Sequence, residues 1–140
     1  MGAGKTIVLK DGSTERKFLI KSMGAYQAES WMYRAALAIG RNVNDVAGLF
    51  GGSKLAVIQT LFRINYTEAK PLLDELLECV YLVNGDGMVQ LSESNVSMIE
   101  VPTTLMRLRI EAFKQNFGFF TSGSEFSSLL GLPTEPTAQA

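Results

Sequence analysis

Few residues of this chain have the types and spacing that enzymatic chemistry requires. The chain has no histidine, and Cys79 is its single cysteine. The sequence therefore lacks histidine general bases, Ser-His and Cys-His nucleophile pairs, and histidine-ligated zinc sites. Cys79 lies in the apolar run of residues 76–80, which is typical of a small core residue in a reducing compartment. We therefore expect no enzyme, no cofactor and no metal site.

Two short motifs resemble ligand-binding loops. Gly4-Lys5-Thr6 matches the end of a phosphate-binding P-loop, but that motif needs a strand before it and a helix after it. Here the next segment is itself predicted to be a strand, so we interpret the match as chance. Residues 84–87, Asn-Gly-Asp-Gly, contain oxygen ligands for calcium, but the later acids of a calcium-binding loop are out of register. A hairpin turn is the simpler interpretation.

The charges of the chain do not favour a nucleic-acid or a membrane partner. Thirteen Lys and Arg stand against fourteen Asp and Glu, for a formal charge of -1. A protein that binds nucleic acid mainly through phosphate contacts usually has a basic excess, which this chain lacks. A membrane-spanning helix is not expected either, because no apolar stretch approaches the roughly 20 residues that span a bilayer.

Three acids, Asp74, Glu75 and Glu78, lie close together in one predicted helix. We interpret them as its solvated face, because catalytic carboxylates need a pocket and unequal environments.

Apolar periodicity and turn residues predict the elements. Alternating apolar residues around Asp11-Gly12 predict a β-hairpin over residues 5–20, and residues 80–91 predict a second hairpin. Helical periodicity and capping residues predict helices that begin near Ser22, Ser53, Thr67 or Pro71, and Pro102. The expected fold class is α+β, with an N-terminal hairpin, about four helices and a short hairpin before the last helix.

We expect one domain over residues 1–121 and a flexible C-terminal tail over residues 122–140. The stretch after Thr121 is rich in Ser, Gly, Thr and Pro, which is typical of a segment that is mobile or ordered by a partner. It contains one apolar cluster, at residues 126–132.

The last predicted helix is more apolar than a surface helix needs to be. At 100° per residue, one stripe consists of Leu105, Leu108, Ala112 and Phe119, and a second of Met106, Ile110, Phe113, Phe117 and Phe120. Together they cover roughly 200°, about twice the arc that packs one face of a helix. Either the helix is covered on two sides, or one stripe packs inward and the other binds a partner helix. The candidate partner-binding residues are Met106, Ile110, Phe113, Phe117, Phe119 and Phe120.

Three segments carry a resemblance to a known family. The first is the hairpin sequence Ile-Val-Leu-Lys-Asp-Gly at residues 7–12 with Phe18-Leu19-Ile20, and the second is a helix carrying Glu29, Trp31 and Arg34. The third is the ending RLRIEAFKQNFGFF at residues 107–120. With them the chain, from about residue 5 to 122, resembles the tail assembly chaperones of long-tailed bacteriophages.

The resemblance implies a non-enzymatic role in virion assembly. Such chaperones bind the tape measure protein, a long helical chain that sets tail length, and keep it soluble in the host cytoplasm. The tail tube protein then displaces them, so they are absent from the mature virion, and in many phages a frameshifted C-terminal extension recruits the tube subunit. The resemblance therefore implies the tape measure protein as a partner, with the tail tube protein as a second.

The composition independently agrees with a protein that binds other proteins. Six Met and eight Phe supply adaptable contact area, and the mean hydropathy of +0.12 is high for a small monomer. With the two hairpins, this predicts a homo-oligomer. Two alternatives remain open. One is a structural virion component, such as a head-tail connector or tail subunit, and the other is a small regulatory or nucleic-acid-binding domain.

Overall fold

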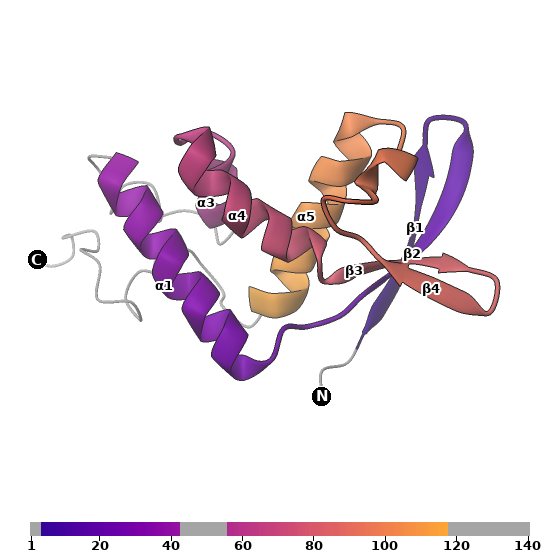
Figure 1. Cartoon of the computed structure of the whole chain (residues 1–140), viewed down its shortest axis with the longest axis horizontal. Coiled ribbons are helices and arrows are strands. Elements are labelled where there is room, and N and C mark those ends of the chain that lie inside the picture. Colours follow the sequence, from indigo (N-terminus) through magenta and orange to yellow (C-terminus); the bar gives the residue numbers. More distant parts are fainter. Residues whose placement is uncertain (1–3, 43–55, 118–140) are drawn as a thin grey trace, which may run out of the picture. The chain divides into compact units, whose positions relative to one another are not determined.

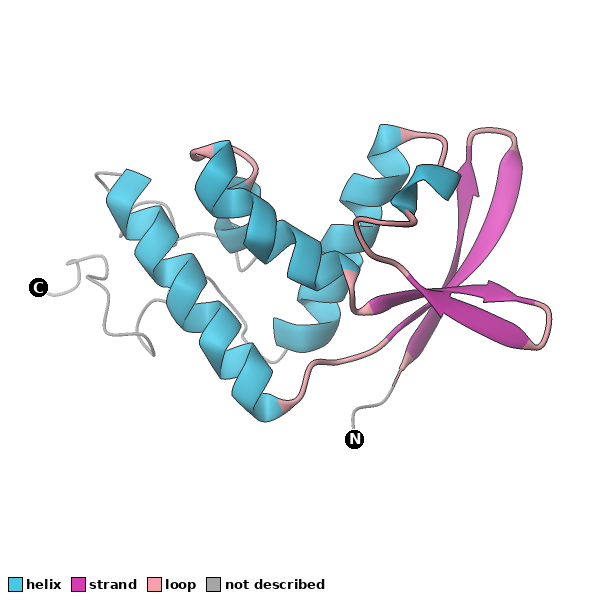
Figure 2. Cartoon of the chain, in the orientation of Figure 1, coloured by secondary structure: helices cyan, strands magenta, loops and turns pink. Residues whose placement is uncertain are grey.

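The structure is a computed structural model that describes residues 4–42 and 56–117 (Figure 1). The strands are β1 (Lys5–Asp11), β2 (Thr14–Ile20), β3 (Val80–Asn84) and β4 (Gly87–Gln90). The helices are α1 (Ala25–Asn42), α3 (Ala56–Leu61), α4 (Tyr66–Leu77) and α5 (Pro102–Phe117), and a short 3-10 turn, η1 (Val96–Met98), precedes α5. The predicted α+β class, with its two hairpins and its last helix starting at Pro102, is confirmed (Figure 2).

The chain divides into two compact units, each built from two separate stretches. Within the described residues, the first unit contains residues 4–24 and 73–116, and the second contains residues 25–42, 56–72 and 117. Two of the three changes from one unit to the other fall inside helices, between Leu72 and Leu73 of α4 and between Asn116 and Phe117 of α5. The predicted boundary at residue 121, the tail after it and the predicted helix start at Ser53 all lie outside the described residues.

The two predicted hairpins belong to one antiparallel sheet with the strand order β1-β2-β3-β4. β2 pairs with β3 through four residue pairs, from Lys17 opposite Val83 to Ile20 opposite Val80. The sequence predicted each hairpin but not this pairing, because β2 and β3 are separated by 59 intervening residues, 21–79. Each hairpin closes with a two-residue turn, in which Gly12 and Gly85 adopt φ values of 67° and 64°. These left-handed values favour glycine because a Cβ would be strained there.

Lys5 and Thr6 are the first residues of β1. The segment that follows Gly4 in the GKT motif is therefore a strand, as predicted, rather than a helix. Residues 84–87 form the turn between β3 and β4, which confirms the hairpin interpretation of that motif.

The sheet has one buried and one open face. Register places Ile7, Phe18, Leu82 and Val89 in one row, and Phe18 and Leu82 in that row are buried. The adjacent residues on the other face form the row Val8, Lys17, Val83 and Met88, in which Val8 is 56% and Met88 is 50% exposed. α5 lies on the buried side, because Lys5, from that face, contacts Glu111 of α5 with Nζ 3.2 Å from Oε1.

The second unit is built around Trp31 of α1, whose side chain is fully buried. Its indole N–H donates to the carbonyl of Leu72 (2.9 Å), and its ring stacks on Phe117 with centroids 5.1 Å apart. The inner face of α1 is formed by Trp31, Ala35, Ala38 and Ile39, which are all buried. In α4, Asn65 caps the helix by accepting from the N–H of Thr67 (2.8 Å). Pro71 lies inside this helix rather than at its start.

Candidate protein-binding surface

An open groove of about 450 Å³ lies in the first unit, between β1 and the N-terminal half of α5. It is lined by Leu9 and Lys10 from β1 and by Thr103, Thr104, Met106, Arg107 and Ile110 from α5. Met106 is 44% exposed, and Leu9 and Ile110 are half-buried. The groove therefore combines accessible aliphatic side chains with a polar rim, which is the composition expected of a site for an amphipathic segment.

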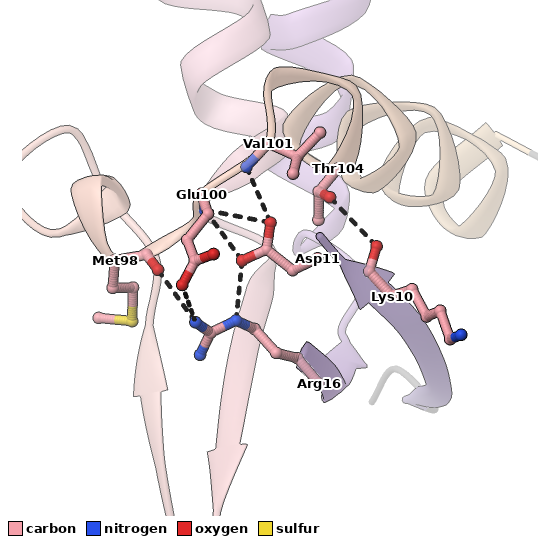
Figure 3. Close-up of polar contacts among 7 residues, drawn as sticks. All are labelled: Lys10, Asp11, Arg16, Met98, Glu100, Val101 and Thr104. Carbon is pink, nitrogen blue, oxygen red and sulfur yellow. Dashed lines mark hydrogen bonds and ion pairs between the residues drawn. The ribbon is translucent and has the colours of Figure 1, made fainter. Parts of the chain in front are cut away.

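Asp11, at the end of β1, fixes the wall of the groove by binding the start of α5 (Figure 3). Its buried carboxylate accepts hydrogen bonds from the backbone N–H groups of Glu100 (2.9 Å) and Val101 (2.8 Å) and from Nε of Arg16 (2.8 Å). One residue back, the carbonyl of Lys10 accepts from the hydroxyl of Thr104 at 3.5 Å. Strand and helix are thereby joined at one end of the groove, which we call the Asp11 clamp.

The electrostatics of the clamp keep Asp11 ionised. Burial alone would raise the pKa of Asp11, but the hydrogen bonds from Glu100, Val101 and Arg16 outweigh it and hold the pKa below its ordinary value. Arg16 in turn donates to the carbonyl of Met98 (3.3 Å) and lies 3.8 Å from the carboxylate of Glu100. The buried charge is therefore paired and fully hydrogen-bonded, as a stable buried carboxylate must be.

Basic side chains surround the groove. Lys10 and Arg107 line it, and Lys5, Arg107 and Lys114 converge on the buried carboxylate of Glu111 at 3.2, 3.1 and 3.7 Å. Burial would raise the pKa of Glu111, but the contacts with Arg107, Lys5 and Lys114 lower it overall. With the Asp11 clamp included, five cations on the β1–α5 side stand against three acids in a chain whose formal charge is -1. The cations are Lys5, Lys10, Arg16, Arg107 and Lys114, and the acids are Asp11, Glu100 and Glu111. An acidic partner fits this side best.

The predicted partner-binding stripe is divided by the structure. Met106 and Ile110 lie in the groove, whereas Phe113 and Phe117 are each 1% exposed. Phe117 packs on Trp31, so a client could reach it only if α5 moved. Phe119 and Phe120 lie outside the described residues. The stripe is accessible in its first half and buried in its second, a division that helical periodicity does not reveal because it depends on what packs against α5.

Cys79 and Asp74, two of the reactive side chains considered in the sequence analysis, have structural roles. Burial raises the pKa of the Cys79 thiol to about 11, so the thiol stays protonated at neutral pH. Of the predicted acidic face, Asp74 pairs with Arg109 at 3.4 Å and Glu78 is exposed. Within residues 4–42 and 56–117, no group of three His, Cys, Asp or Glu side chains could hold a metal ion. No described helix has the length and apolarity to cross a membrane.

Two surface features were missed by the sequence analysis. Tyr26, Tyr33 and Leu37 follow one line along α1 and are 86%, 60% and 59% exposed. Their spacing of seven and four residues is a helical signal, but it was overlooked beside the stronger core stripe of the same helix. The second feature is the Asp11 clamp, because Asp11-Gly12 was interpreted only as a turn. Only the folded chain brings Asp11 to residues 100 and 101.

Comparison of the chain with protein-family models, with curated proteins and with solved structures finds no match in any of the three. The function of the chain is therefore inferred from its own sequence and from the geometry of the groove.

Proposed function

We propose that the chain is a non-enzymatic tail assembly chaperone of a long-tailed bacteriophage, which binds and solubilises the tape measure protein during tail assembly in the host cytoplasm. The observation that carries the proposal is the groove between β1 and α5, with Leu9, Met106 and Ile110 accessible along it. A long client rich in amphipathic helices aggregates when its apolar faces are exposed. A chaperone that covers such faces needs adaptable aliphatic and thioether contacts and no catalytic group.

The basic rim supports a particular kind of client segment. Lys10 and Arg107 can pair with acidic residues beside the apolar stripe of a bound helix, which fixes its register and speeds its encounter with the groove. The modest size of the groove favours an exchangeable complex over a permanent one. Exchange suits a chaperone that the tail tube protein must displace.

The experiment is co-expression of the chain with the tape measure protein of the same genome, followed by affinity purification and measurement of the melting temperature. The test variant is Met106→Ser with Ile110→Ser, which removes two accessible aliphatic side chains from the groove. The control is Tyr33→Ser with Leu37→Ser, because these side chains are exposed, as Met106 is, but lie on α1. Since Ile110 is half-buried, the melting temperature shows whether the test variant stays folded. We expect the test variant to recover at least tenfold less tape measure protein, as for loss of a binding anchor.

Three outcomes would contradict the proposal. Equal recovery by test and control variants would move the client site away from the groove. Salt-sensitive retention of the chain on DNA or RNA, lost in Lys10→Ser with Arg107→Ser, would assign the basic rim to nucleic acid. Detection of the chain in purified virions would favour the alternative of a structural component such as a connector or tail subunit.

A further inference from the structure

The two edge strands of the sheet, β1 and β4, are protected to different degrees from pairing with a further strand. β1 carries Lys5 and Lys10, and Thr104 of α5 covers its outer edge by donating to the Lys10 carbonyl. β4 consists of Gly-Met-Val-Gln, all exposed and uncharged. Edge strands of stable monomers usually carry charges, prolines or bulges, or are covered, because their free N–H and C=O groups would otherwise pair with another strand.

The hydrogen-bond register shows which groups of β4 are directed to the open edge. The N–H of Leu91 donates to the carbonyl of Val80 (2.9 Å), so residues 80 and 91 are a hydrogen-bonded pair. Hydrogen-bonded pairs alternate along an antiparallel ladder, so the next ones between β3 and β4 are 82 with 89 and 84 with 87. The alternation of an antiparallel ladder then directs the N–H and C=O of Met88 and Gln90 away from β3. No strand of the described residues follows β4 in the sheet. The carbonyl of Gln90 accepts from Asn95 (2.8 Å), which leaves the edge most open at Met88.

We propose that β4 pairs with β4 of a second copy of this chain, antiparallel and centred on Met88. The arrangement joins two four-stranded sheets into one continuous sheet across a two-fold axis. In this register Met88 lies opposite the Met88 of the other copy, and Gln90 lies opposite Asp86, so no like charges oppose one another.

The open face of the sheet also favours a second copy as the partner. Met88 ends the row Val8, Lys17, Val83 on that face, and the pairing continues this row into the same row of the other copy. The two Lys17 side chains are then five strand spacings apart, roughly 24 Å at about 4.8 Å per spacing, well beyond the Debye length of about 8 Å. A helical client could not use the edge, because its backbone groups are bonded internally.

The edge is only four residues long, so the dimer is weak, with a dissociation constant in about the micromolar range or above.

This self-association does not depend on the proposed function. It is tested on the full chain alone by sedimentation velocity over a concentration series up to about 1 mM. Met88→Glu opposes two carboxylates at the axis and should weaken the dimer at least tenfold. Val8→Glu is the matched control, since Val8 is exposed in the same row but on the opposite edge strand.

Charge reversal and crosslinking make the test specific. Met88→Lys alone should also be monomeric, and an equimolar mixture of the Met88→Glu and Met88→Lys chains should form a heterodimer. Met88→Cys, a smaller change in case the charged variants misfold, should oxidise to a covalent dimer, with the buried Cys79 as an inert background thiol. A wild-type chain that stays monomeric over the series would overturn the proposal. So would a dimer that Met88→Glu leaves intact, or a Met88→Cys chain that does not crosslink.

Discussion

At the scale of single residues, the Asp11 clamp explains why a turn aspartate is buried, although few charged side chains among residues 4–42 and 56–117 are. Its carboxylate accepts from Arg16, five residues away across the hairpin, and from the backbone N–H groups of Glu100 and Val101, about 90 residues away in the sequence. The N–H groups just before a helix lack intrahelical partners, and a carboxylate at that end also interacts favourably with the helix dipole. One side chain therefore satisfies the start of α5 and holds it against β1.

Asp11→Asn should reduce the free energy of unfolding by about 2–4 kcal/mol at pH 7, because the amide cannot accept all three bonds and Arg16 loses its buried partner. Since the folded-state pKa of Asp11 is lowered, its stabilising contribution is present above the pKa of the unfolded chain, about 3.9. It is lost as the pH falls through the folded-state value. The difference in stability between wild type and variant should therefore be full at pH 7 and shrink below about pH 4.

Urea unfolding of both chains between pH 7 and pH 3 measures this difference. Glu15→Gln is the control, because Glu15 is an exposed acid in the same hairpin. A stability difference that stays constant with pH would mean that the charge of Asp11 does not act as described.

At the scale of elements, the second hairpin depends on the left-handed backbone of Gly85, where φ is 64°. Gly85→Ala should cost roughly 1–2 kcal/mol of stability from conformational strain alone, since a Cβ there would contact nothing within 4 Å. Gly24→Ala is the control, because Gly24 also has open space around it but no left-handed backbone. Thermal unfolding of the two variants compares them directly. An equal effect of both changes would argue against strain at the turn.

The elements that the sequence predicted well are those whose signals are local. Helix α5 begins at Pro102 as expected, because proline fixes the first helical position, and both hairpins close at the predicted glycine turns. The pairing of β2 with β3 was not predicted, because it joins segments far apart in the chain and no local pattern records it.

The candidate site was predicted in part for the same reason. The periodicity of α5 identified Met106 and Ile110, which line the groove, but it gave equal weight to Phe113 and Phe117, which are core. A stripe on a helix shows which residues share a face. It does not show how far along that face other segments of the same chain pack. Here the buried part of the stripe ends between Phe113, which is buried, and Ile110, which lines the groove.

At the scale of the whole molecule, the proposed surfaces are distinct. The groove between β1 and α5 is basic and apolar and suits an acidic, amphipathic client segment, whereas the edge of β4 is uncharged and suits a second copy. Both lie in the first unit. A dimer that uses opposite edges of each sheet for client and copy could hold two client segments without the two kinds of contact competing.

Hydrogen-deuterium exchange of the chain with and without the tape measure protein tests the central claim most directly. We expect client-dependent protection of backbone amides in β1 and in the N-terminal half of α5, residues 103–110, with little change along α1. The Met106→Ser, Ile110→Ser variant should lose this protection while its own exchange in β2 and β3 stays as in wild type. Protection concentrated on α1 around Tyr33 and Leu37, with the groove unchanged, would contradict the account.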